Sequence, residues 1–361
     1  MAYALTPPVP RSRKAIAFAT FAARGELVLQ HCAECGAIAY PFREACPKCL
    51  SVDLRWAPVP DRARLIAATT IRVSPQPYFA QHLPWRTGTV SLGDGVSILA
   101  HLHGQVMPGD DVRLIARTDK AGNGAIIAMP REETASLMED PQLREFSCAP
   151  AGRRILVTDG TNPLGQALAH ALLDAGAAAI VLGVPRGAAV DPRLAGRAGV
   201  ETVALDVTDP ASVASAATAL GAAFDILVNT AVDAGNGRAA MEVNYFGLAN
   251  LIDAFGQALR CAWVNPLSAG GLGTSASFAA AHAALLGLRG DLAARGAKTV
   301  LVWSGALDAA NAKPIAQKIV HALEQGLEEA AVGAVAEDVL SRWRADPALF
   351  LREVARQESQ S

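Results

Sequence analysis

The pattern of apolar and polar positions divides the chain into two halves of different character. Residues 12–24 (SRKAIAFATFAAR) place apolar residues at helical spacing, which predicts a short helix that ends before Gly25. Between Arg62 and about Met129, five short β-rich runs alternate with turns that contain Gly, Pro and Asp. Short strands at this spacing predict a small barrel.

After Arg153 the pattern switches to strands that alternate with helices. The strand-like runs are RRILVTDG, AAIVLG, VETVALDVTD, FDILVNTAV, CAWVNPLS and KTVLVWSG. Alternation of this kind predicts a Rossmann-like α/β domain with a doubly wound parallel sheet. We therefore expect an N-terminal helix within 1–25, a cysteine-rich segment at 26–58, a barrel at 59–130, a polar linker at 131–152, a Rossmann-like domain at 153–310 and a helical tail at 311–361.

The composition fits ordinary folded domains and excludes several classes of protein. Of the 361 residues, 51% are apolar and 18% are charged, which excludes a disordered, collagen-like or small disulfide-stapled chain. The formal charge of −2 argues against a strongly basic nucleic-acid binder. The sequence has no apolar run long enough for a membrane span, and MAYALTPPVPRSRK lacks the apolar region of a signal peptide. We expect a cytoplasmic protein with no membrane or nucleic-acid partner.

Four of the six cysteines have the spacing of a metal site. They form the pattern C-x2-C-x10-C-x2-C and are Cys32, Cys35, Cys46 and Cys49. Two residues between cysteines let one tight turn direct both sulfurs at one point, and two such turns supply four thiolates for tetrahedral Zn²⁺. Four sulfurs leave no open position for water, so we expect a structural zinc ribbon. Cys148 and Cys261 stand alone and are expected to be inert buried thiols.

Other side chains of the first half each allow two interpretations. His101 and His103 alternate along one predicted strand and share a face, which suits a metal or a CoA phosphate. A hydrogen-bonded or exposed strand face is the simpler interpretation for both. Tyr78, Phe79 and Trp85 lie in a long loop, where they either contact a partner or acyl-CoA or cover one end of the barrel. Aromatic residues are sparse, at 5% of the chain, which argues against a single-stranded nucleic-acid interface.

The first half resembles the zinc-ribbon and OB-fold proteins that accompany thiolases and acyl-CoA aldolases. The matching segments are GELVLQHCAECGAIAYPFREACPKC, TTIRVSPQP and VSILAHLHG, within about 25–130. The chain is also similar to subunits of benzoylsuccinyl-CoA thiolase-type complexes. The resemblance implies a rubredoxin-like zinc ribbon plus an OB-fold β-barrel. It also implies a subunit that docks on a thiolase-fold or aldolase catalytic subunit and helps bind acyl-CoA.

The second half is similar to short-chain dehydrogenases/reductases across about 153–305. LDVTD matches the segment near the adenine ring, and ILVNTA matches the strand that usually ends in Asn-Asn-Ala-Gly. With the phosphate loop, the resemblance implies a cofactor site that contains Gly160, Gly165, Asp206 and Asn229.

The same resemblance locates the remains of an active site. VNYFG and NPLS match the segments that carry the catalytic asparagine and serine, here Asn244 and Ser268. Active members also need a Tyr-x-x-x-Lys pair, in which the tyrosine transfers a proton and the lysine lowers its pKa. The aligned helix has Phe278 and His282 at these positions. Phenylalanine has no ionisable group and histidine is mostly neutral near pH 7, so we expect all four residues to be relics.

The phosphate loop departs from the family pattern T-G-x-x-x-G-I-G as well. Asp159 replaces the first glycine and puts a carboxylate where the pyrophosphate lies, at a helix N-terminus that attracts anions. Pro163 replaces the second glycine and removes a backbone N–H, although Gly160 allows part of the turn. After the second strand, Arg186 suits either a 2′-phosphate or solvent. The loop match is weak, and we expect little NAD(P) binding.

Together these features predict a non-catalytic accessory subunit of a β-oxidation-like degradation pathway. We expect structural Zn²⁺, a CoA thioester as ligand, and a hetero-oligomer that dimerises through the dehydrogenase-like domain. Two alternatives stay open: an NAD(P)-dependent 3-hydroxyacyl-CoA oxidoreductase, and a stand-alone acyl-CoA-binding protein. Titration with NADH and NADPH separates the first from the accessory role, and binding of CoA esters by the isolated protein identifies the second.

Overall fold

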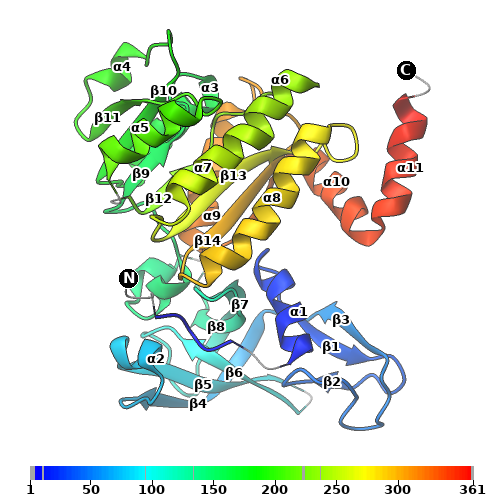
Figure 1. Cartoon of the computed structure of the whole chain (residues 1–361). Helices are drawn as coiled ribbons and strands as arrows, with labels where there is room; N and C mark the ends of the chain where they lie inside the picture. The colour runs from blue at the N-terminus through cyan, green and yellow to red at the C-terminus, as the bar shows by residue number, and fades with distance from the viewer. Residues whose placement is uncertain are drawn as a thin grey trace. The chain divides into compact units, whose positions relative to one another are not determined.

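The chain folds into two units, each with its own core (Figure 1). The computed structural model describes residues 5–9, 12–93, 95–132, 134–221, 224–235 and 237–358. The first unit contains residues 1–148 with the short segments 294–296 and 324–328, and the second contains the rest. Within the described residues, no helix is long and apolar enough to cross a membrane.

The first unit begins with a helix that packs on a small sheet. The helix α1 (Arg13–Ala22) begins after Ser12, whose side chain accepts a hydrogen bond from the N–H of Ala15. The sheet has the order β2-β1-β3 and contains β1 (Val28–Cys32), β2 (Ile38–Ala39) and β3 (Leu54–Pro58). Phe18 on α1 is buried, and its ring centroid lies 4.7 Å from that of Phe42. This aromatic contact fixes the helix against the cysteine-bearing segment.

The five predicted strands form a closed barrel with the order β4-β5-β6-β8-β7. They are β4 (Arg62–Ile71), β5 (Trp85–Gly93), β6 (Val96–Leu102), β7 (Asp111–Thr118) and β8 (Gly124–Pro130). A short helix, α2 (Pro77–Gln81), interrupts the connection between β4 and β5. Leu65, Val90 and Leu114 point inward and are almost fully buried, as the alternation of side chains along each strand requires. The barrel is therefore filled by side chains.

The polar segment that was expected to be a linker packs against the barrel. It forms two 3-10 helices, η1 (Leu137–Glu139) and η2 (Leu143–Phe146). Leu137, Leu143 and Phe146 are buried in one cluster with Trp85. These three apolar side chains are spaced too irregularly to predict a helix or strand. The polar residues around them therefore led to the prediction of a linker.

The second unit is built on a seven-stranded parallel sheet with the order β11-β10-β9-β12-β13-β14-β15. The strands are β9 (Arg154–Val157), β10 (Ala179–Val184), β11 (Val200–Ala204), β12 (Ile226–Val228), β13 (Ala262–Ser268), β14 (Lys298–Ser304) and β15 (Glu329–Val332). The order reverses between β9 and β12, which is where ligands bind in sheets of this kind. The doubly wound Rossmann-like prediction is confirmed.

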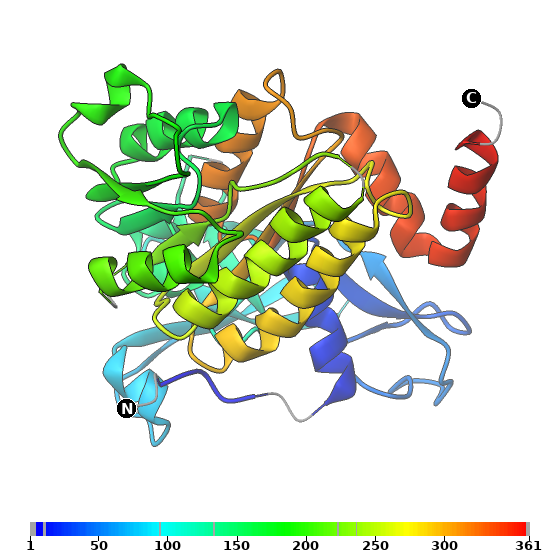
Figure 2. The same cartoon turned by 45° about the horizontal axis from the view of Figure 1, so that its top comes forward.

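Helices cover both faces of this sheet (Figure 2). On one face lie α5 (Pro210–Leu220), α7 (Leu248–Phe255) and α8 (Ala276–Ala293), which share a core with Leu156 and Trp263 of the strands. On the other face lie α3 (Pro163–Asp174) and α9 (Ala312–Gln325). Three shorter helical elements are α4 (Pro192–Ala195), α6 (Arg238–Met241) and the π-helix η3 (Glu242–Gly247).

The sequence led us to expect a helical tail at 311–361, but this region also contains a strand. Strand β15 pairs with β14 and extends the sheet by one strand, from Leu301↔Glu329 to Ser304↔Val332. Two helices follow, α10 (Gly333–Ala345) and α11 (Pro347–Glu358). The strand has only four residues, EAAV, and three of them are poor strand formers. Pairing with a long buried neighbour, not local preference, makes it a strand.

Candidate functional site

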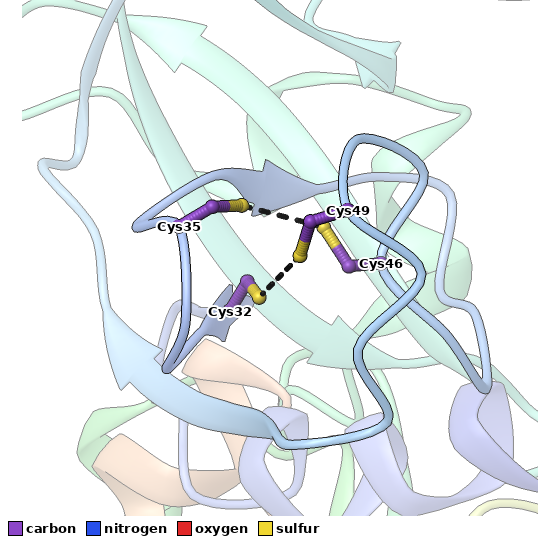
Figure 3. A group of neighbouring side chains, drawn as sticks. All are labelled: Cys32, Cys35, Cys46 and Cys49. Atoms are coloured by element: carbon purple, nitrogen blue, oxygen red, sulfur yellow. Dashed lines mark hydrogen bonds between the residues drawn. The ribbon is translucent and has the colours of Figure 1, made fainter.

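The four predicted cysteines converge on one point (Figure 3). Their sulfur atoms all lie within 4.8 Å of one another. The Sγ atoms of Cys32 and Cys49 are 3.5 Å apart, and those of Cys35 and Cys46 are 3.7 Å apart. A tetrahedral zinc ion with Zn–S distances of about 2.3 Å separates its sulfurs by about 3.8 Å. The four thiols are therefore close to the arrangement that tetrahedral Zn²⁺ requires.

Backbone amides around the cysteines favour the thiolate form that binds metal. The N–H of Cys35 points at the sulfur of Cys32 and lowers the pKa of that thiol. The amides of Cys49 and Lys48 lower the pKa of Cys46 to about 6. The Lys48 amide lies 3.4 Å from Sγ of Cys46. Each C-x2-C turn thus directs N–H groups at its first sulfur. Cys148 and Cys261 are buried and lie outside the four-sulfur group.

The aromatic residues of the barrel loop are mostly packed against the barrel. Tyr78 is buried and its hydroxyl donates a 3.0 Å hydrogen bond to Glu145. Trp85 is buried and donates from Nε1 to Nδ1 of His101 at 2.9 Å. Phe79 borders a small hollow of about 260 Å³ in the same unit. Tyr78 and Trp85 therefore cover the barrel, whereas Phe79 is only partly buried and lines a surface hollow.

The two strand histidines are not a solvent-exposed pair. Burial lowers the pKa of His101 to about 4, so its ring is neutral and accepts the hydrogen bond of Trp85 through Nδ1. His103 follows β6, is 2% exposed and accepts at Nδ1 from the N–H of Gln105. The hydrogen-bonded interpretation describes both residues, whereas an exposed face does not.

In the second unit, the strand-order reversal carries a cleft of about 600 Å³. Its walls come from the loops that follow β9, β11, β12 and β14 at their carboxyl ends. This is the crevice where a Rossmann-like fold holds a dinucleotide. Its chemistry depends on which side chains these four loops present.

The phosphate loop is occupied by its own side chains. Asp159 accepts hydrogen bonds from the backbone N–H and the hydroxyl of Thr161, at 2.8 and 2.7 Å. Asn162 caps α3 by accepting from the N–H of Gly165 at 2.7 Å, and Pro163 has no N–H to offer. Two backbone N–H donors at this helix N-terminus, those of Thr161 and Gly165, therefore already have partners within the loop.

The same arrangement recurs in the other three loops of the crevice. Asp206 accepts from the N–H and hydroxyl of Thr208, at 3.0 and 2.7 Å. Asp233 accepts from the N–H of Gly235 at 2.7 Å. Asp308 accepts from the N–H of Asn311 at 3.0 Å. With Asp159, four aspartates line the cleft, and its described lining contains no Lys, Arg or His. Asp233 and Asp308 were not among the predicted site residues, although each lies within three residues of the end of a predicted strand.

The glycines and the asparagine assigned to the cofactor site have structural reasons to be there. A Cβ on Gly165 would lie 1.9 Å from the carbonyl oxygen of Asp159, and one on Gly160 would lie 2.6 Å from Leu182. Asn229 is buried and joins three strands, because it accepts from Thr158 at 2.9 Å and donates to Asn265 at 3.0 Å. These positions maintain the loop and sheet whether or not a nucleotide binds.

The four residues predicted at the family's catalytic positions lie on three elements, η3, β13 and α8. Asn244, on the π-helix η3, bonds through its amide to the backbone N–H and carbonyl of Asp233, at 2.9 and 2.7 Å. The same amide donates to the hydroxyl of Ser277 at 3.0 Å. Ser268 is partly buried at the end of β13. Phe278 is 4% exposed and belongs to the core.

His282 stands at the position of the family's lysine, beside an aromatic ring and near Glu329 and Arg289. Its ring packs edge-on against Trp303 with centroids 5.0 Å apart. Burial lowers the pKa of His282, which keeps the ring neutral. None of Asn244, Ser268, Phe278 and His282 can donate a proton as tyrosine does or carry the charge of lysine.

Two known domain families match consecutive segments of the first half. Residues 20–55 match "ChsH2, rubredoxin-like zinc ribbon domain", and residues 56–117 match "ChsH2, C-terminal OB-fold domain". Both matches agree with the ribbon and barrel described above. Among curated proteins, no sequence matches the chain.

Solved structures of short-chain dehydrogenases match the second half. One from Burkholderia cenocepacia J2315 in complex with NADP is 28% identical, covers 56% of this chain and 98% of its own, and gives a TM-score of 0.51. One from Streptomyces avermitilis is 24% identical over 58% of this chain and 98% of its own, with a TM-score of 0.49. A structure described as "Ltp2-ChsH2(DUF35) aldolase" is 22% identical, covers 35% of this chain and all of its own, and gives a TM-score of 0.31.

Proposed function

For this fusion of a ChsH2-type zinc ribbon and OB fold with a short-chain dehydrogenase fold, we propose the role of a non-catalytic accessory subunit. It docks on a thiolase-like or acyl-CoA aldolase partner and helps bind acyl-CoA in a β-oxidation-like pathway of the cytoplasm. The observation that carries the proposal is the combination of two consecutive ChsH2-type domains, at 20–55 and 56–117, with a second unit whose crevice is lined by four aspartates and, among the described residues, by no Lys, Arg or His.

The loss of the acid–base pair supports a non-catalytic second unit. Hydride transfer to a carbonyl needs a proton donor within hydrogen-bond reach of the oxygen. Phe278 offers none, and the neutral ring of His282 packs against Trp303. Ser268 and Asn244 alone orient a substrate at most, and the Asn244 amide is already bonded within the protein.

The charge of the crevice supports the same conclusion. A dinucleotide brings at least two negative charges, which a protein neutralises with helix N-termini, Arg or Lys. Here four carboxylates line the crevice, and each accepts a hydrogen bond from one backbone N–H of its own loop. These internal hydrogen bonds support the shape of the loops without a bound anion.

The zinc ion has a structural role in this proposal. Four thiolates complete a tetrahedral shell, so the ion supplies folding energy to the ribbon and no open position for chemistry. The ribbon packs against α1 through Phe18 and Phe42, which ties the metal site to the rest of the unit.

The α8 helix supports dimerisation through the second unit. Most of its exposed positions are small or apolar and include Ala276, Ala279, Ala283 and Leu286, whereas Asp291 near the end of the helix is charged. Leu286 alone is 48% exposed. A helix face of this composition lets another helix approach closely and bury apolar surface. Sedimentation of the wild type against Leu286→Glu tests this part, and a monomeric wild type removes dimerisation from the proposal.

Purification of the chain from its native cells, with mass spectrometry of what co-elutes, tests the accessory role. We expect a thiolase-fold or aldolase protein in stoichiometric amount. Deletion of the first unit should abolish its recovery, whereas Leu286→Glu should not. A chain that elutes alone at native expression levels contradicts the accessory role.

An NAD(P)-dependent 3-hydroxyacyl-CoA oxidoreductase is the second candidate. It is favoured by the 28% identity to a short-chain dehydrogenase in complex with NADP and by the retained Asn244 and Ser268. Fluorescence titration with NADH and NADPH decides between the two. Saturable micromolar binding, with turnover that Ser268→Ala abolishes, would establish the enzyme.

A further inference from the structure

A cleft of about 540 Å³ lies on the barrel of the first unit and is rich in arginine. Among the described residues, its charged lining consists of four arginines and two aspartates: Arg62, Arg64, Arg113, Arg131, Asp61 and Asp111. We propose that this arginine cleft binds the clustered phosphates of a nucleotide, namely the adenosine 3′,5′-bisphosphate end of a CoA thioester. The proposal rests on the proposed function only for the identity of the ligand.

Strand register places the arginines on one outer face of the barrel. Arg62 on β4 is directly opposite Arg113 on β7, and Arg64 is opposite Asp111. Ala63, between the two β4 arginines, is buried in the barrel core. Because side chains alternate along a strand, Arg62 and Arg64 both point away from that core. Arg131, just after β8, adds a fourth guanidinium from the neighbouring strand.

The Arg62–Arg113 pair is unfavourable without an anion. Like charges directly opposite each other on adjacent strands destabilise a sheet. The Nε atom of Arg113 is buried and has no hydrogen-bond partner among the described residues. A buried donor without a partner costs free energy that a bound acceptor would recover. Both features are explained if the native state of this cleft includes a bound oxyanion.

The two aspartates do not neutralise the cleft. Asp111 lies 3.9 Å from Arg64 and 3.8 Å from Arg131, both too far for a hydrogen bond. Four guanidinium groups against two carboxylates leave a net charge of +2. Guanidinium groups match phosphate oxygens in pairs, and the volume falls in the range of ordinary ligand sites.

The cleft and the Rossmann crevice have opposite charges at similar volume. In the part of the chain that the structure describes, the crevice presents four carboxylates and no cation, whereas the cleft presents four cations and two carboxylates. We therefore expect a ligand with several phosphates to bind at the arginine cleft of the barrel and not in the crevice. This chain has its anion site on the accessory domain and not on the fold that usually binds nucleotides.

Calorimetric titration of the zinc-loaded full chain with adenosine 3′,5′-bisphosphate tests the inference. We expect saturable binding, similar binding of CoA, and no binding of adenosine. Arg113→Gln and Arg62→Gln should each weaken binding about tenfold, the loss of one charge-assisted hydrogen bond. The matched control is Arg55→Gln, because Arg55 pairs with Asp53 on the ribbon and does not line the cleft. This variant should bind as the wild type does.

Thermal unfolding separates a ligand site from a purely structural role. Arg62→Gln and Arg113→Gln should each raise the melting temperature of the ligand-free chain, because each removes one charge of the like-charge pair. Both variants should also reduce the increase in melting temperature that the bisphosphate causes. No saturable binding by the wild type at millimolar concentration overturns the inference, and so does equal weakening by Arg55→Gln. Equal affinity for an oligothymidylate of matched charge also overturns it, in favour of a general nucleic-acid surface. Recovery of a catalytic partner from cells is independent of all these results, so a failed titration leaves the accessory role standing.

Discussion

Gly36 and Leu50 occupy equivalent positions in the two cysteine turns of the zinc ribbon. Each directly follows the second cysteine of a C-x2-C pair and donates its backbone N–H to the carbonyl of the first cysteine, at 3.0 Å. Their φ angles are +70° and +64°, in the left-handed region. Glycine adopts this conformation freely, whereas leucine does so at a cost. The Leu50 side chain is 77% exposed, so packing does not offset the strain.

Replacing Leu50 by glycine should therefore stabilise the ribbon. We expect Leu50→Gly to raise the free energy of unfolding by about 1 kcal/mol, the cost of one left-handed L-residue. Urea unfolding of the zinc-loaded chain, followed by far-UV circular dichroism, measures the change. Gly36→Ala is the matched control and should lose a similar amount, since open space surrounds Gly36 and only its φ opposes a side chain. A destabilised Leu50→Gly would mean that this leucine makes a contact that outweighs its backbone strain.

Loss of one zinc ligand should unfold the ribbon. Cys32→Ser or Cys49→Ser removes a thiolate from the four-sulfur group, and metal-binding energy in such a domain is folding energy. We expect loss of bound zinc by elemental analysis and loss of strand signal by circular dichroism. Cys148→Ala, which removes a thiol outside the group, should keep its zinc. A spectrum that does not change when a chelator removes the metal would contradict the prediction.

Local patterns were sufficient to predict the metal site and both folds. The C-x2-C spacing is a property of one turn, and strand–helix alternation is a property of neighbouring segments, so neither needs knowledge of distant contacts. The relics Phe278 and His282 could be assigned because the order of motifs along the second half fixes their positions.

Features that depend on distant contacts could not be predicted. Strand β15 exists because β14 offers it a pairing edge. The four aspartates meet in one crevice only through the strand order, which brings the loops after β9, β11, β12 and β14 together. The strain at Leu50 and the bond between Trp85 and His101 likewise arise from the folded backbone.

The half-buried His101 should make the first unit sensitive to mild acid. Its folded-state pKa of about 4 lies below the value of about 6.5 expected for an unfolded histidine. Between these values the unfolded chain binds a proton that the folded chain excludes, so stability falls as the pH drops through this window. The shift corresponds to a loss of about 2 kcal/mol between pH 7 and pH 5.

Urea unfolding at the two pH values measures this loss, and His101→Gln provides the comparison. Glutamine retains an acceptor for Trp85 Nε1 but does not titrate, so the difference between the two pH values should shrink by about 2 kcal/mol in the variant. Acid release of zinc affects both proteins and cancels in the comparison. An identical pH dependence in wild type and variant would show that the pKa of His101 is the same in the folded and the unfolded chain.

A single change in the phosphate loop should not restore dinucleotide binding. Asp159→Gly removes one carboxylate, but Asn162 still caps the N–H of Gly165 and Pro163 still lacks a donor. Asp206, Asp233 and Asp308 continue to repel the phosphates from the other loops of the crevice. Titration with NADPH, followed by its fluorescence, should show no saturation below the millimolar range. Asp206→Asn tests the contribution of a second carboxylate in the same background. Micromolar binding by Asp159→Gly alone would show that one carboxylate, and not the whole set of loops, keeps the nucleotide out.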